Sequence, residues 1–373
     1  MKVVVLTDIY PNDYGKSDGI FVRNQVKVIE KMGIEVNVIY VDLRSFRKKR
    51  KWGLEKYQDG ATNVYHYSLP IGPIPILLEF LYVISLKKVV IHYIKMVGKP
   101  DVLHGHFYLN GFWADYFLKK YGIRTVLTEH SSELYQEKIG FFHRRLMRQA
   151  YDNANVLISV SEALKRRMQR YTSNEIRVIP NALAKDFYFE KSNVIKKESA
   201  FTFLFIGHVI KTKGIELLIT SFEVMQKACP NISLKIVGNG NLLNKMKAYV
   251  KERDLNVSFM GEVSHSEIPF ICRQCDCFVL PSEKETFGVS YIEAMACGLP
   301  VIATKCGGPE EFVNDTNGML IPVNDAEKLL WAMQEMYESK DEYNPQTISQ
   351  NIIGTYGEKA FAKELIYAYE NMI

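Results

Sequence analysis

Short runs of β-branched and aromatic residues alternate with longer stretches of helical periodicity along almost the whole chain. This alternation is typical of a parallel sheet covered by helices. In the first half the runs predict strands at Lys2–Thr7, Glu35–Tyr40, Val102–His106, Thr125–Thr128, Val156–Val160 and Arg177–Pro180. After a polar, unpatterned segment at Lys191–Ser199, a second set of strands is predicted at Phe201–Ile206, Leu234–Val237, Val257–Met260, Cys277–Leu280, Pro300–Ala303 and Gly318–Pro322.

The two sets of strands predict an α/β protein made of two Rossmann-like, doubly wound domains. We place the first domain at residues 1–190 and the second at residues 191–355. A length of 373 residues agrees with two or three domains. Because ligands of such sheets bind beyond the carboxyl ends of the strands, we expect a cleft between the facing domains, lined by polar residues that follow strands.

The hydrophobic and charged fractions, 47% and 24%, are ordinary for a globular protein and exclude disordered, collagen-like and small disulfide-rich classes. The most apolar stretch, residues 73–86, contains Glu79, runs into Lys87 and Lys88, and is shorter than the roughly 20 residues that a membrane-spanning helix needs. The apolar run after Met1 ends at Asp8, which indicates a strand and not a signal peptide. We therefore expect no spanning segment.

Charge is distributed unevenly within the net +5. Residues 1–180 hold 28 Lys and Arg against 17 Asp and Glu, whereas residues 181–373 hold 19 against 25. The one charge run is FRKKRKW, Phe46–Trp52. A basic half of this kind fits an anionic membrane surface or nucleic acid, and a solvated basic surface without a partner is the other interpretation.

Six cysteines in this length do not resemble a secreted disulfide framework, and a reducing compartment fits them best. Cys272, Cys275 and Cys277 are close in sequence, but no second pair with ligand spacing follows them. We expect no metal site.

The segment Pro281–Glu311 is the densest in candidate chemistry. After a buried strand comes a loop with Glu285, then a helix at about Gly288–Cys297 that contains Glu293. The start of that helix offers free backbone N–H groups and a positive dipole, which suit a diphosphate. We assign this contact to Thr286, Phe287, Gly288 and Val289. A carboxylate next to a phosphate is repelled, so both glutamates are better used on sugar hydroxyls.

Glu285 and Glu293 match the E-x7-E motif, and here the chain resembles glycosyltransferase family 4, retaining enzymes of GT-B fold. The resemblance extends over nearly the whole chain in segments of matching order and spacing: PNDYGKSDGIFVRNQVKVIEKMGIEV, VLTEHSS, VIPNAL, GHVIKTKG, GNGN and the Pro281–Glu311 block. It implies a GT-B architecture, two Rossmann-like domains facing a cleft. In that architecture the last helix, about Gly357–Met372 within residues 356–373, crosses back onto the first domain. Its apolar residues follow helical spacing: Phe361, Leu365, Ile366 and Tyr369.

The resemblance assigns roles to three charged residues of the second domain. Glu293 is expected to bind the nucleotide ribose, and Glu285 to contact hydroxyls of the donor sugar. Lys213, in KTKG, matches the lysine that neutralises the donor diphosphate, whose charge grows in the transition state.

The segment GHVIKTKG, which opens with Gly207 and His208, is expected to border the diphosphate. The family commonly has arginine where this chain has His208. Histidine is only partly charged at neutral pH. The replacement of the family's arginine by His208 therefore predicts weaker or pH-dependent diphosphate binding, or a different cation in that role.

The first domain contributes two further residues by resemblance. Gly19 matches the glycine that lets backbone approach the diphosphate, and His130, after the strand that ends at Thr128, matches a histidine near the donor sugar. His106 follows its strand in a similar way, with less support from the family.

The sequence shows no nucleophile with a neighbouring base, so nothing in it indicates a double-displacement mechanism. The resemblance implies retention of anomeric configuration. It also implies that the nucleoside diphosphate leaves and the acceptor attacks on the same face of the donor sugar, and that the leaving phosphate acts as the base. Because no D-x-D occurs, we expect a metal-independent enzyme. We expect no cofactor besides the donor substrate, a UDP-sugar or a GDP-sugar.

The expected function is transfer of that sugar to a glycan or lipid-linked glycan, as in bacterial polysaccharide assembly. A nucleotide-sugar 2-epimerase of the same fold is the alternative, and a pure binding module is disfavoured by the clustered charged residues. A dinucleotide dehydrogenase is excluded because the first strand runs into TDIYPND and not into G-x-G-x-x-G. We expect a cytoplasmic protein with no nucleic-acid partner, docked at the inner membrane face through Arg47, Lys48, Lys49, Arg50 and Lys51 between Phe46 and Trp52.

Overall fold

The computed structural model describes residues 1–12, 18–43, 51–70, 75–136, 139–189 and 200–371. The chain divides into two compact units. The first unit comprises Met1–Ala182 and Lys359–Ile373, and the second comprises Leu183–Glu358. The sequence analysis places the corresponding bounds after residue 190 and after residue 355.

The first unit contains an eight-stranded sheet with the order β3-β4-β2-β1-β5-β6-β7-β8. Its strands are β1 (Lys2–Thr7), β2 (Glu35–Asp42), β3 (Gly53–Asp59), β4 (Thr62–Ser68), β5 (Val102–His106), β6 (Arg124–Glu129), β7 (Val156–Ser159) and β8 (Ile176–Val178). All neighbours pair in parallel except β3, which pairs antiparallel to β4. The sheet is therefore parallel, as the strand pattern predicts, with one antiparallel strand, β3, at its edge.

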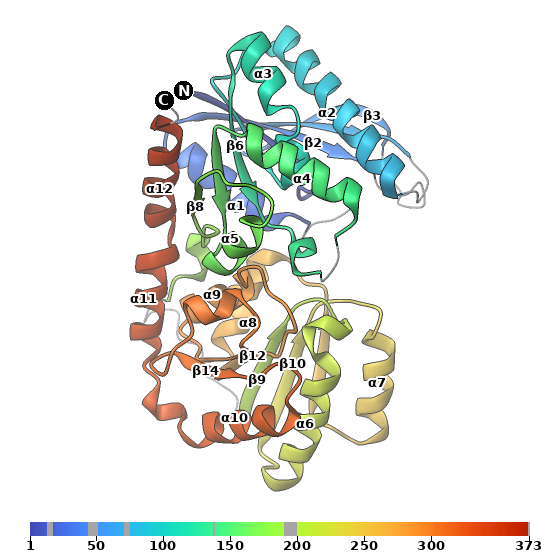
Figure 1. Ribbon diagram of the computed structural model, residues 1–373. Coiled ribbons are helices and arrows are strands. Elements are labelled where there is room, and N and C mark those ends of the chain that lie inside the picture. The colour runs from blue at the N-terminus through green and yellow to red at the C-terminus, as the bar shows by residue number, and fades with distance from the viewer. Residues whose placement is uncertain (13–17, 44–50, 71–74, 137–138, 190–199, 372–373) are drawn as a thin grey trace. The chain divides into compact units, whose positions relative to one another are not determined.

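Six described helices belong to this unit (Figure 1): α1 (Ile20–Lys31), α2 (Pro75–Val97), α3 (Ala114–Tyr121), α4 (Phe141–Asn153), α5 (Glu162–Met168) and α12 (Glu358–Glu370). Alternate residues of β1 face opposite sides of the sheet. Val3 and Val5 pack with α1 and α12, whereas Val4 and Leu6 pack with α2 and α3. The sheet therefore lies between two layers of helices.

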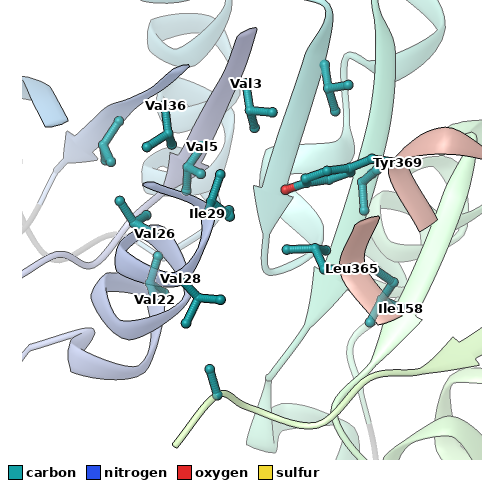
Figure 2. Close-up of a cluster of buried hydrophobic side chains, with 14 of the residues drawn as sticks. Val3, Val5, Val22, Val26, Val28, Ile29, Val36, Ile158, Leu365 and Tyr369 are labelled. Carbon is teal, nitrogen blue, oxygen red and sulfur yellow. The ribbon is translucent and has the colours of Figure 1, made fainter. Parts of the chain in front are cut away.

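The last helix, α12, supplies four buried side chains to the first unit's core: Phe361, Leu365, Ala368 and Tyr369. Figure 2 shows Tyr369 and Leu365 reaching from α12 toward the valines of β1 and α1, with the Tyr369 hydroxyl pointing into the unit. Burial of such side chains contributes about 1.5 to 3 kcal/mol each, so α12 is held firmly to this sheet.

The second unit contains a six-stranded parallel sheet with the order β11-β10-β9-β12-β13-β14. Its strands are β9 (Phe201–Ile206), β10 (Ile232–Val237), β11 (Val257–Gly261), β12 (Cys277–Leu280), β13 (Val301–Thr304) and β14 (Gly318–Ile321). Its helices are α6 (Ile215–Ala228), α7 (Leu243–Glu252), α8 (Ile268–Arg273), α9 (Val289–Ala296), α10 (Ala326–Glu338) and α11 (Pro345–Tyr356). Both units are thus doubly wound α/β folds, as the strand pattern predicts.

Residues 75–86 of the apolar stretch that the sequence analysis weighed as a membrane span belong to α2, and residues 73 and 74 lie outside the described residues. Among the described residues, no helix has the length and apolar character needed to cross a membrane.

Candidate functional site

The strand order of each sheet marks where a ligand is expected. In the second unit the chain leaves β9 toward β10 on one side and later returns to β12 on the other, so β9 and β12 are neighbours at the point where the winding reverses. The loops that follow these two strands diverge at such a point and leave room for a ligand. One loop carries Lys213, and the other carries Glu285.

A close approach of the two loops positions Lys213. Gly214 has φ +69°, and a Cβ atom there would lie 2.1 Å from the carbonyl oxygen of Pro281. Only glycine fits, so the lysine at the end of the short helix Lys211–Lys213 is carried against the loop after β12. The Glu283 N–H donates to the Thr212 carbonyl at 2.9 Å and ties the loops together.

Lys213 and Glu285 form an ion pair, with 2.6 Å between Nζ and Oε1. The Ser282 hydroxyl donates to the same carboxylate oxygen at 2.7 Å. The side chains are 24% and 10% exposed, respectively, so the pair is partly shielded from water yet still reachable. The structure therefore brings together two of the residues that the sequence singled out, one cationic and one anionic.

Glu293 lies on α9 and is nearly buried, with 7% of its side chain exposed. Its Oε1 lies 2.7 Å from Nε2 of His265, which is in the short helix His265–Glu267 after β11. The imidazole also packs on Phe187, with 5.0 Å between ring centroids. His265 holds one of the two carboxylate oxygens, and a carboxylate has further lone pairs that can accept a hydrogen bond from a hydroxyl ligand. The sequence analysis did not identify His265.

The side chain of Phe287, just before α9, points into the core of the second unit. Phe287 is buried, and its ring packs against Phe312 and Tyr356 with centroids 5.6 and 5.5 Å away. The Phe287 side chain therefore belongs to the core, and the residue can contact a ligand only by donating a hydrogen bond from its backbone N–H. Thr286, Gly288 and Val289 surround it, and Gly288 is the residue from which the helix begins.

Gly207 and His208 follow β9 directly, as expected for the first loop of this unit. The Gly207 N–H donates to the Val237 carbonyl at 3.0 Å, and the Val209 N–H donates to the Asn239 carbonyl at 2.9 Å. The loop is thus packed on the turn after β10. The His208 side chain is exposed.

The first unit has its own reversal of winding, between β1 and β5. Gly19 precedes α1 with φ +69°, and a Cβ atom there would lie 2.6 Å from the Ile9 carbonyl oxygen. A side chain would clash, so glycine is required to fold the loop after β1 onto itself. Two residues further on, the Phe21 ring lies 4.7 Å from the His130 ring, centroid to centroid.

His130 follows β6 and is 7% exposed. Its Nε2 lies 2.9 Å from Nδ1 of His106, which ends β5. Burial lowers the pKa of His130 to about 3, so the imidazole is neutral at physiological pH. A neutral imidazole has one N–H group and one lone pair, so His130 can donate one hydrogen bond and accept another.

Glu129, beside His130, is fully buried and accepts hydrogen bonds from the backbone N–H groups of His130 (3.0 Å) and Ser131 (2.8 Å) and from the Tyr151 hydroxyl (2.7 Å). Desolvation is the largest influence and raises the pKa of Glu129 from 4.5 to about 7. The folded protein therefore binds this proton more tightly than the unfolded chain. The resulting stabilisation is complete below about pH 4.5 and is lost as the pH rises through 7.

Replacing Glu129 with glutamine should remove this pH dependence, because the amide keeps a carbonyl oxygen for the two N–H groups and does not ionise. We expect the melting temperature of Glu129→Gln to exceed that of the natural protein at pH 8 by about 5 °C, and the difference to shrink toward pH 5. Thermal unfolding from pH 5 to 8 measures this. A difference that stays constant with pH would contradict the assignment.

No group of three or more His, Cys, Asp or Glu side chains in the described ranges could hold a metal ion. Cys272, Cys275 and Cys277 are buried cysteines that are not joined in disulfides. Two of them donate to backbone carbonyl oxygens, at 3.3 Å for Cys275 and 3.4 Å for Cys277.

Comparison with known proteins accounts for both units. Residues 19–186 match the family described as Glycosyltransferase Family 4, and residues 186–360 match Glycosyl transferases group 1. The chain belongs to the family 4-like glycosyltransferases. It is a GT-B glycosyltransferase, and the resemblance seen in the E-x7-E block is confirmed.

Two curated relatives of this glycosyltransferase align with it over its full length. One is the putative teichuronic acid biosynthesis glycosyltransferase TuaC of Bacillus subtilis, 24% identical over 100% of this chain and 99% of that protein. The other is the O-antigen chain mannosyltransferase C of Escherichia coli, 24% identical over 100% and 98%. This glycosyltransferase is therefore related to enzymes of bacterial polysaccharide assembly.

Two solved structures share its fold. Sucrose-phosphate synthase of Thermosynechococcus elongatus superposes with a TM-score of 0.81 at 19% identity, covering 100% of this chain and 99% of that one. HepE of Anabaena, in complex with UDP, superposes with a TM-score of 0.74 at 18% identity, covering 99% and 100%.

Proposed function

We propose that this glycosyltransferase moves a sugar from a UDP- or GDP-sugar to a glycan or lipid-linked glycan, with retention of anomeric configuration. The observation that supports it most is the ion pair between Lys213 and Glu285 at the winding reversal of the second sheet. A cation for a diphosphate and a carboxylate for sugar hydroxyls are held there side by side.

We assign the donor's groups to the second unit as follows. Lys213 neutralises the diphosphate, aided by the backbone N–H groups of Thr286–Val289 and by the loop of Gly207 and His208. Glu285 accepts hydrogen bonds from the donor sugar. Glu293 accepts from the ribose, through the oxygen that His265 does not hold.

The ion pair gives Lys213 a defined position before the donor binds. When the diphosphate arrives, the ammonium has three N–H donors, so it can keep one bond to Glu285 and direct the others at phosphate oxygens. As the glycosidic bond breaks, charge accumulates on the leaving phosphate, and the fixed cation stabilises it most at that stage. In this scheme the acceptor attacks from the leaving group's side, and the phosphate takes the acceptor's proton.

From the first unit we assign the Gly19 backbone to the diphosphate and His130 to the donor sugar. The neutral state of His130 fits a hydrogen-bonding role. The choice between UDP and GDP is left to experiment. The UDP bound to HepE supports a UDP-sugar, and the nucleotide-sugar panel described below tests GDP-sugars beside UDP-sugars.

The donor scheme contains no metal, so turnover should survive a chelator. We expect the initial rate in EDTA to stay within about twofold of the rate without it, because Lys213 and backbone N–H groups take the place of a divalent ion. Complete loss of activity in EDTA with recovery on adding Mg²⁺ or Mn²⁺ would refute the metal-free scheme.

We also propose that the basic run Phe46–Trp52 docks on an anionic bilayer. Arg47, Lys48, Lys49 and Arg50 lie outside the described residues, whereas Lys51 and Trp52 are exposed and Lys51 pairs with Glu55 at 2.8 Å. At about 1 kcal/mol per basic residue, five charges would give reversible, salt-sensitive binding. Such docking would suit a lipid-linked acceptor.

Vesicle sedimentation tests the docking. We expect pelleting with anionic vesicles at low salt, and loss of pelleting at high salt, with neutral vesicles, or when the five basic residues are replaced with serine. Equal and negligible pelleting in all conditions would favour a soluble acceptor.

A thermal-shift panel of nucleoside diphosphate sugars tests the donor class, since a ligand at 100 times its Kd adds about 2.7 kcal/mol of stability. The same panel serves the alternative, a nucleotide-sugar 2-epimerase of this fold. That enzyme would convert the stabilising donor to an isomer with no acceptor present, whereas a transferase would need the acceptor.

A further inference from the structure

Three buried histidines form a stack in the first unit. His104 and His106 lie two residues apart on β5 and therefore share one face of the sheet. Their rings stack with centroids 4.6 Å apart, and the His130 ring stacks on His106 with centroids 5.2 Å apart. His104 and His106 are fully buried, and His130 is almost so.

Burial keeps all three rings neutral. Desolvation lowers the pKa of His104 and of His130 to about 3, and lowers the pKa of His106 well below its usual value. A neutral imidazole has one N–H group and one lone pair. The 2.9 Å contact between Nδ1 of His106 and Nε2 of His130 must therefore have one donor and one acceptor.

The second ring nitrogen of His106, Nε2, indicates which of the two rings donates the hydrogen bond. His106 Nε2 is buried and has no hydrogen-bond partner in the described part of the chain. If His130 donated, the His106 proton would lie on this nitrogen as an unpaired N–H group. If His106 donates, the nitrogen is only an unpaired lone pair. Buried N–H groups without partners are the rarer of the two, so His106 is assigned as the donor.

We infer that His106 is a positioning residue that fixes His130 in the tautomer with its proton on Nδ1, so that Nδ1–H is offered to an oxygen of the donor sugar. The inference deepens the proposed function and rests on it for the identity of that oxygen. The tautomer itself follows from the two histidines alone.

Two phenylalanine rings also pack against the His130 ring. The rings of Phe21 and Phe107 lie 4.7 and 5.3 Å from the His130 ring, centroid to centroid. Phe107 has φ 68° and ψ 149°, a conformation that glycine adopts readily and that costs other residues about 1 to 3 kcal/mol. Its N–H donates to the Thr128 carbonyl at 2.9 Å, which continues the β5–β6 pairing. The unfavourable backbone conformation of Phe107 therefore occurs at a residue whose ring packs on His130.

His104 supports the stack from behind. Its Nδ1 lies 2.7 Å from the Tyr369 hydroxyl of α12, and its Nε2 lies 2.8 Å from the Thr128 hydroxyl. Both nitrogens are thus occupied, and the ring cannot turn to replace His106 as the partner of His130.

Nitrogen-15 NMR of the full chain with labelled histidine tests the tautomer, because two-bond correlations distinguish a protonated from an unprotonated ring nitrogen. The variants His106→Asn and His130→Gln assign the two rings. We expect Nδ1 to carry the proton in both, with no change between pH 5 and 8. A proton on Nε2 of His130, or titration of either ring in this range, would overturn the inference.

Donor kinetics test the positioning role. His106→Leu should lower kcat/KM for the donor about tenfold, the size expected for one hydrogen bond. His106→Asn should recover most of the loss, because its amide nitrogen can donate from the place of Nδ1. His92→Asn, at an exposed histidine on α2, is the matched control and should match the natural protein. Equal kcat/KM in His106→Leu and the natural protein would refute the role.

The two experiments separate this inference from the proposed function. If the NMR signature is as expected and no nucleotide sugar binds, the proposed function fails and the tautomer stands. If donors bind and turn over while His130 carries its proton on Nε2, the inference fails alone.

Discussion

Replacing Lys213 with alanine is expected to lower kcat by about 100-fold or more and to change donor affinity far less. The reason is that charge on the leaving diphosphate is greatest in the transition state, where removal of one fixed electrostatic contact costs about 2.7 to 4 kcal/mol. Steady-state kinetics with the donor identified by thermal shift measures both constants.

Lys211→Ala is the matched control for this experiment, because Lys211 is an exposed lysine in the same short helix. It should retain nearly the natural kcat. Lys213→Arg, which keeps the charge, should retain more activity than Lys213→Ala. If Lys213→Ala raised only KM, the lysine would bind the ground state and the proposed role in departure of the diphosphate would be wrong.

Glu293→Ala is expected to weaken donor binding by about 10- to 100-fold, because it removes a charge-assisted hydrogen bond worth about 1.5 to 3 kcal/mol. It also leaves the part-buried His265 without its 2.7 Å partner. Calorimetric titration with the nucleoside diphosphate and with the full donor should show a similar loss for both, since the ribose is common to them.

Glu338→Ala, at an exposed glutamate on α10 of the same unit, is the control and should bind as the natural protein does. His265→Ala should weaken binding less than Glu293→Ala, because the carboxylate remains. Unchanged donor affinity in a folded Glu293→Ala protein would remove Glu293 from the ribose site.

The strands that pattern predicts best are those buried on both faces. The predictions for β9 and β12 match the structure residue for residue, because each is a short and almost entirely apolar run. The hairpin of β3 and β4 was not predicted. The buried positions of β4 include Thr62, His66 and Ser68, and β3 lies at the sheet edge with only its alternate residues half-buried, so neither strand shows the apolar alternation on which the prediction depends.

The sequence likewise predicted some residues of the candidate site and missed others. Lys213, Glu285 and Glu293 lie in segments whose order resembles a known family, so the sequence could name them. The partners that orient them come from loops with no such signal. His265 is placed by the capping box of Ser264 and Glu267, and His106 meets His130 only because β5 pairs with β6 in the register His106 to Thr128. Contacts of this kind depend on strand register, which a single sequence does not specify.

The most direct test of the central claim is the amount of nucleoside diphosphate that the protein releases from its donor with and without a glycan or lipid-linked acceptor. The account predicts release that depends on the acceptor, is matched by an equal amount of glycosylated product, and falls at least 100-fold in Lys213→Ala. Conversion of the donor to an isomer without any acceptor, or equal release by Lys213→Ala, would contradict it.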